Sequence, residues 1–204
     1  MNTTHKPNWW YLWCVWVAAS VAGFGLPAIG FQGLGLCLTQ ATPAVLGALI
    51  FCGTAGVGAS LPGFLHYFIL RDWFPRAAWW ILASGAGSIS GFILLGWGLA
   101  VADTGTGIVH EYVLPNLAFG GAGAVVGTMQ WLVFRRWFSR AGWWVAASTM
   151  SWLGATYVYA LSTRGNDVNV PLGGILSGAV SGAITGLVLI LLWRNTPANQ
   201  TPAK

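Results

Sequence analysis

A five-residue motif that begins with tryptophan and ends with serine recurs in this chain at intervals of 64 residues. It reads WVAAS at residues 16–20, WILAS at 80–84 and WVAAS at 144–148. The match between the second and third copies is longer, because RDWFPRAAWW at 71–80 aligns with RRWFSRAGWW at 135–144. Self-similarity at a fixed period predicts one structural unit that is copied three times.

The composition predicts that this unit is embedded in lipid. Hydrophobic residues make up 56% of the chain and charged residues only 6%, which is far from the balance of a soluble domain. Apolar stretches cover roughly residues 9–30, 43–70, 77–101, 113–134, 141–161 and 171–193. Each reaches the roughly 20 residues that a helix needs to cross a bilayer, and a helix satisfies its own backbone where water is absent. We therefore expect an all-α integral membrane protein with six transmembrane helices.

The first apolar stretch has a second interpretation as a secretory signal peptide, because Lys6 precedes it. The stretch starts with Trp9 and Trp10, runs past the usual length of a signal's apolar core and contains the first copy of the motif. A retained first span is therefore the favoured interpretation.

The positions of the basic residues predict the orientation. Of the nine lysines and arginines, all but Arg164 lie at the two ends of the chain or in the links after the second and fourth spans: Lys6, Arg71, Arg76, Arg135, Arg136, Arg140, Arg194 and Lys204. Cytoplasmic loops carry an excess of such residues, so both termini are expected in the cytoplasm. Because orientation accounts for the net charge of +5, no nucleic-acid partner is expected.

The chain is therefore expected to be a single transmembrane domain over residues 1–204, built from three parallel αα-hairpins. The first hairpin covers about 9–72, the second about 73–136 and the third about 137–195, and a polar tail follows at 196–204. Each hairpin closes with a glycine eight residues before an arginine, once the outer loop of the third is allowed to be about five residues shorter. Pro62 is expected to disturb the second span locally.

Small residues recur every four positions on the even-numbered spans. Spacing of four places them on one helical face, where the lack of side chains lets helices approach closely. The residues predicted to pack helices together are Gly63, Gly123, Gly127, Gly174, Gly178, Gly182 and Gly186. We expect the even-numbered spans to be the inner packing elements, although the odd-numbered spans carry similar pairs.

Aromatic and basic residues flank the two basic links and are expected to anchor the helix ends at the lipid headgroups. This set comprises Arg71, Trp73, Arg76, Trp79, Trp80, Arg135, Trp137, Arg140, Trp143 and Trp144. A second interpretation has these rings stack on a pigment or a quinone, and the sequence does not distinguish the two.

His66 lies within the second span, five residues before Arg71, and an ionisable residue inside a membrane span is a candidate functional residue. The aligned residues of the other copies are Gln130 and Leu189, which argues against a site repeated three times. The favoured interpretation is that His66 and Gln130 form hydrogen bonds between helices. A role for His66 as ligand of a pigment metal is the alternative.

No catalytic or metal site is predicted. Asp103, His110 and Glu111 lie in the second outer loop, but their spacing is poor for a metal, so a solvated loop is expected. Serines are plentiful in the spans, yet no histidine occurs in the last three and the acidic residues lie in links and loops. An intramembrane hydrolase is therefore not expected.

One part of the sequence resembles a known group of proteins. Residues 123–136, which contain Gln130-Trp131-Leu132-Val133-Phe134-Arg135-Arg136, are followed by Ala141-Gly142-Trp143-Trp144-Val145-Ala146-Ala147-Ser148. These runs are similar to the GxxQWLVLRR and AGWWVLAS motifs of small multi-pass membrane proteins from cyanobacteria and Chloroflexi-like bacteria. The resemblance is strongest over 123–148 and weaker over 59–84, where His66-Tyr67 replaces Gln-Trp. The resemblance implies a bacterial membrane location and a repeated hairpin, and it implies no enzymatic activity and no catalytic residue.

The sequence thus favours a non-enzymatic structural or accessory subunit of a bacterial cytoplasmic or thylakoid membrane, in contact with lipids and with other membrane subunits or pigments. The alternative is a channel or facilitator for a small, weakly polar solute, because a parallel repeat is typical of some transporters but a charged group near the middle of the spans is lacking.

Overall fold

The computed structural model describes residues 8–38, 44–162 and 169–195, and within them the chain is all α-helical with no strand. The helices are α1 (Trp9–Leu38), α2 (Ala44–Leu70), α3 (Ala78–Ala102), α4 (Leu114–Phe134), α5 (Trp143–Ser162) and α6 (Val170–Arg194), and a π-helical turn, η1 (Val109–Val113), precedes α4. The predicted polar tail and Lys6, Arg164 and Lys204 lie outside the described residues.

Four stretches of the described residues are long and apolar enough to cross a membrane. They are Trp9–Ile29 in α1, Ala78–Ala102, Val109–Phe134 and Val170–Arg194. The apolar stretch of α2 that qualifies by composition, Gly56–Leu70, is shorter, and α5 carries more polar residues.

Local signals set several helix ends. The side chain of Asn8 accepts hydrogen bonds from the backbone N–H groups of Trp10 and Tyr11, and that of Asn169 accepts one from Leu172 at 2.9 Å. Asparagine at these positions satisfies donors that the first turn leaves free. Pro62 does not interrupt α2, which continues to Leu70.

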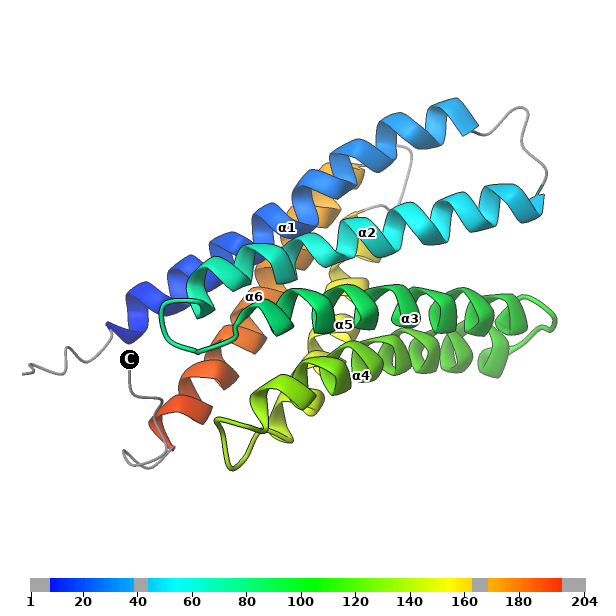
Figure 1. Ribbon diagram of the computed structural model, residues 1–204. Coiled ribbons are helices and arrows are strands. Elements are labelled where there is room, and N and C mark those ends of the chain that lie inside the picture. Colours follow the sequence, from blue (N-terminus) through cyan, green and yellow to red (C-terminus); the bar gives the residue numbers. More distant parts are fainter. Residues whose placement is uncertain (1–7, 39–43, 163–168, 196–204) are drawn as a thin grey trace, which may run out of the picture.

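The six helices form a closed ring (Figure 1). Each packs against its neighbours in sequence, and α6 packs against α1 in the most extensive of these contacts. Within the described part of the chain no backbone contact crosses the ring. The centre of the bundle is therefore lined by side chains from all six helices.

Each pair of neighbouring hairpins meets where a glycine of an even-numbered helix faces a serine of the next odd-numbered helix. A Cβ atom added at Gly127 would lie 2.7 Å from the Cβ of Ser148, and one at Gly182 would lie 2.8 Å from that of Ser20. Gly63 faces Ser84 even more closely. The remaining predicted packing glycines also lie against an adjacent helix: Gly123, Gly174, Gly178 and Gly186. Side chains at these positions would force the helices apart.

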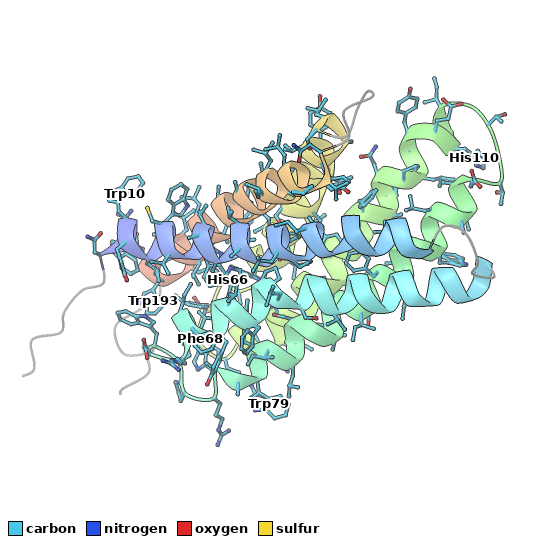
Figure 2. The ribbon with its side chains drawn as sticks, turned by 90° about the horizontal axis from the view of Figure 1, so that it is seen from above. Trp10, His66, Phe68, Trp79, His110 and Trp193 are labelled. Atoms are coloured by element: carbon cyan, nitrogen blue, oxygen red, sulfur yellow. The ribbon has the colours of Figure 1, made fainter. Side chains whose placement is uncertain are left out.

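Both sets of helices contribute to the interior. The odd-numbered helices place their motif tryptophans and serines at its centre, so the inner packing elements are not confined to the even-numbered spans. The described arginines lie at one end of the bundle, called here the arginine end, together with the links at 71–77 and 135–142. Figure 2 shows Trp10, Trp79 and Trp193 toward this end and His110 at the other.

Candidate functional site

Three tryptophans spaced 64 residues apart meet at the centre of the ring. Trp16, Trp80 and Trp144 form a triangle with ring centroids 5.6–6.2 Å apart and edge-to-face geometry, and each is only 1% exposed. We call this group the tryptophan triangle. Trp80 and Trp144 therefore do not anchor the helix ends at the lipid surface, contrary to expectation. Their neighbours Trp79 and Trp143 are 56% and 66% exposed.

A layer of large apolar side chains closes the arginine end beneath the triangle. We call it the aromatic plug, and it consists of Leu70, Phe74, Phe134, Phe138, Leu189, Leu192 and Trp193. The ring of Phe134 stacks on Trp80 at 4.6 Å and meets Trp144 edge-on at 4.7 Å. Such contacts pack large side chains across the axis at this end.

Polar side chains follow the triangle on its other side. Gln130 donates from Nε2 to the hydroxyl of Ser84 at 3.0 Å and accepts at Oε1 from the indole Nε1 of Trp144 at 2.9 Å. His66 shares a hydrogen bond with Ser20 at 3.0 Å, from the corresponding positions of the first copy. The prediction that His66 and Gln130 form hydrogen bonds between helices is confirmed.

The third copy supplies a hydrogen-bond acceptor for a tryptophan of the triangle from a different residue. Leu189 stands where Gln130 is in the second copy, and the indole of Trp16 donates instead to Thr185, one turn away, at 3.0 Å. Ser151 and Ser181 share a further hydrogen bond between α5 and α6 at 3.1 Å. Buried polar groups are thereby paired across the helices.

The exception is Trp80, whose buried Nε1 has no hydrogen-bond acceptor among the described residues. The partner of Trp144 lies fourteen residues before it, and the residue fourteen before Trp80 is His66. The imidazole ring of His66 instead stacks on Trp16, with ring centroids 3.7 Å apart. A buried donor without an acceptor costs on the order of 1–3 kcal/mol, so the indole of Trp80 lacks the stabilisation that the indoles of Trp16 and Trp144 receive.

Two cavities follow one another along the axis, and all six helices line both. The first, the polar cavity, has a volume of about 50 Å³. Its polar lining includes His66, Ser84, Ser88, Gln130, Ser148, Ser151, Ser181 and Thr185, together with the three rings of the tryptophan triangle. This is room for only a few water-sized groups.

The second, the apolar chamber, has a volume of about 350 Å³ and lies farther from the arginine end. Its lining is mainly apolar and includes Ala28, Phe92, Leu95, Leu99, Phe119, Ala155, Thr156 and Tyr159. Phe24 and Trp152 line both cavities and so lie between them. A volume above 300 Å³ is typical of sites for small organic molecules.

The surroundings of His66 do not fit a pigment ligand. Its Nε2 faces Ser20, Trp16 covers a face of the ring, and the adjoining cavity is far smaller than a tetrapyrrole. The contact with Ser20 has the form of a nucleophile beside a base. However, Ser20 does not line the cavity, and Ser84 makes the same contact with Gln130, which is no base. The pair therefore serves to hold helices together.

No group of three or more potential metal ligands occurs among the described residues. His110 contacts the backbone carbonyl of Ala102 at 3.2 Å. Asp103 and Glu111 are exposed as expected, but His110 and Glu111 lie in the π-helical turn η1 and not in a loop.

Sequence reasoning missed the axial site itself. A signal was present in the sequence, since the tryptophans and serines that meet at the axis are the ones that recur every 64 residues. No protein-family model matches this chain, and neither the curated proteins nor the solved structures contain a significant match.

Proposed function

We propose that this chain is a non-enzymatic, multi-pass membrane protein that receives a small, weakly polar, uncharged solute on its axis and acts as a facilitator for it. The observation that carries the proposal is the succession of an apolar chamber and a polar cavity, both lined by all six helices. A solute with an apolar body and one hydrogen-bond acceptor matches this order, because the chamber receives the body and Trp80 offers an N–H.

The ring supports six crossings, arranged as three parallel hairpins. α5 lies between α4 and α6, and α2 lies between α1 and α3, so both share a layer with helices that are long enough to span a membrane. The 20 residues of α5 extend about 30 Å, which is the thickness of the hydrocarbon core. The arginines at one end support a cytoplasmic position for that end and both termini, in a bacterial cytoplasmic or thylakoid membrane.

The aromatic plug makes the described arrangement a closed one. Solute flux would require the plug to move or to be opened by substitution. An uncharged solute is proposed because, among the described residues that line the two cavities, His66 is the one acidic or basic group.

Solute flux into liposomes tests the proposal, with acetamide and propionamide as probes, because each carries a small apolar body and a carbonyl acceptor, and with light scattering as the readout. Phe134→Ala is expected to raise the flux by opening the plug, and Thr156→Trp in this background is expected to abolish the gain by filling the chamber. Tyr157→Trp is the matched control, because Tyr157 is 67% exposed on the outer face. The proposal fails if folded Phe134→Ala protein conducts no better than empty liposomes, or if both tryptophan variants have the same effect.

An accessory role within a larger assembly is the second candidate. It is favoured by the large apolar side chains that cover the outside of the ring, among them Trp10, Trp97, Leu117 and Tyr157. Lipid or neighbouring helices would cover such a surface. Purification in mild detergent distinguishes the two: a stoichiometric partner supports the accessory role, whereas a protein that is isolated alone and conducts solute supports the facilitator.

A further inference from the structure

A groove of about 580 Å³ lies on the outside of the ring, at the arginine end of α3 and α4. Its floor is apolar and consists of Leu82, Ala83, Met129, Leu132 and Val133. Its rim consists of Pro75, Arg76, Trp79, Arg136 and Trp137, which come from the two basic links and the start of α3. The groove shares no lining residue with the two axial cavities.

The rim carries two positive charges without a negative partner. Arg76 and Arg136 are exposed, and neither forms an ion pair with any described residue. The ion pair that the described residues do form joins Arg71 to the adjacent Asp72, outside the groove, at 3.9 Å. Two guanidinium groups above an apolar floor fit a phosphate group attached to a hydrocarbon chain.

The backbone of Arg76 is unusual. Its φ of 61° lies in the left-handed region, and it is the one non-glycine residue of the described chain with a positive φ. A residue with a Cβ atom pays on the order of 1–3 kcal/mol for such a conformation, and such strain is concentrated at binding sites. Arg140, at the equivalent position of the next link, does not share it.

The pair of arginines is particular to the second hairpin. The residue equivalent to Arg136 is Asp72 in the first copy and Asn195 in the third. The residue equivalent to Arg76 is Leu12 in the first copy and Arg140 in the third. A general need for interfacial anchors would not restrict the combination to one hairpin.

We propose that this groove binds one anionic phospholipid. Its phosphate lies between Arg76 and Arg136, and an acyl chain follows the apolar floor between Leu82 and Leu132. Trp79 and Trp137 flank the glycerol region, where the amphipathic rings of tryptophan are favoured. The proposal requires the membrane location but is independent of any solute on the axis.

Native mass spectrometry of the protein in mixed micelles tests it, with phosphatidylglycerol and phosphatidylcholine as the two probes. We expect one phosphatidylglycerol per chain to be retained in preference to phosphatidylcholine, with weaker retention as salt is raised. Each arginine near a lipid surface contributes about fivefold in affinity, so Arg76→Gln with Arg136→Gln is expected to weaken retention roughly 30-fold.

The matched control is Arg135→Gln with Arg140→Gln, which removes the same charge from the same end but leaves the groove intact. Ala83→Trp is a second variant that fills the floor and leaves the charge unchanged, and it is expected to lower retention as well. The proposal is overturned if the control pair loses as much lipid as the groove pair, or if the two lipids are retained equally. Retention that is unaffected by filling the floor would show that the arginines hold a headgroup at the open surface, and it would also overturn the groove.

Discussion

Replacing Gln130 by leucine tests whether the hydrogen bonds around the tryptophan triangle stabilise the ring. The change deprives Trp144 Nε1 of its acceptor at 2.9 Å and Ser84 of its donor at 3.0 Å. The serine loses one accepted hydrogen bond and keeps its own O–H donor, so its loss is taken as the roughly 0.6 kcal/mol of an average bond between membrane helices. The indole is left without an acceptor, which costs about 1–3 kcal/mol. We therefore expect a destabilisation of about 2 kcal/mol.

The third copy of the repeat supplies the compensating change. There, leucine at 189 coexists with a satisfied tryptophan, because Thr185 accepts from Trp16 at 3.0 Å. The residue equivalent to Thr185 in the second copy is Val126. Adding Val126→Thr to Gln130→Leu gives Trp144 an acceptor in the same relative position. The double variant is expected to recover at least 1 kcal/mol, whereas Val126→Thr alone is expected to change stability by less than that.

The assay is reversible unfolding of the four proteins in mixed micelles by added sodium dodecyl sulfate, followed by far-ultraviolet circular dichroism. The coupling free energy of the two substitutions is the quantity of interest. A coupling near zero, or a Gln130→Leu variant as stable as the parent, would refute the argument that the indole donors need acceptors.

Two further predictions use the same assay. Gly182→Ala is expected to destabilise the protein by about 1–2 kcal/mol, because its Cβ would meet Ser20 at 2.8 Å and the overpacking outweighs the better helix propensity of alanine. Gly121→Ala is the control, since its Cβ would meet a side-chain atom at 3.4 Å, which is ordinary van der Waals contact. Equal effects of the two substitutions would contradict the packing role of Gly182. Trp80→Phe, which removes a donor without an acceptor, is expected to be better tolerated than Trp144→Phe by about 1 kcal/mol or more, and the reverse order of stabilities would show that Trp80 is satisfied in the membrane.

The helices themselves were predictable from the sequence, because long apolar runs favour a structure that satisfies its own backbone hydrogen bonds. The observed α3, α5 and α6 begin and end within two residues of the apolar stretches at 77–101, 141–161 and 171–193. The contact of His66 and Gln130 with neighbouring helices was also predictable, since a polar group in an apolar span needs a partner.

The assignment of adjacent tryptophans was not predictable in the same way. Trp79 and Trp80 are neighbours in sequence, as are Trp143 and Trp144, and neighbours on a helix point about 100° apart. The two tryptophans of each pair therefore have the same flanking sequence, but one is exposed and the other is buried. Periodicity cannot rank the two, because the surrounding helix is apolar on all sides and lipid is as apolar as the interior. The repeat does rank them, since Trp16, Trp80 and Trp144 recur in all three copies whereas the first copy has Val15 at the position of Trp79 and Trp143.

The differences between the copies have a physical consequence for the axis. The triangle is built from identical residues, but the next positions toward the chamber are Phe24, Ser88 and Trp152, all of which line the polar cavity. Three identical side chains there would present the same group from three directions, which suits a spherical ion better than an organic molecule. An uneven lining with a hydroxyl on one side and aromatic rings on the others distinguishes the ends and faces of a low-symmetry solute. The copies therefore differ at positions that line the polar cavity, while the shared tryptophans and serines maintain the ring.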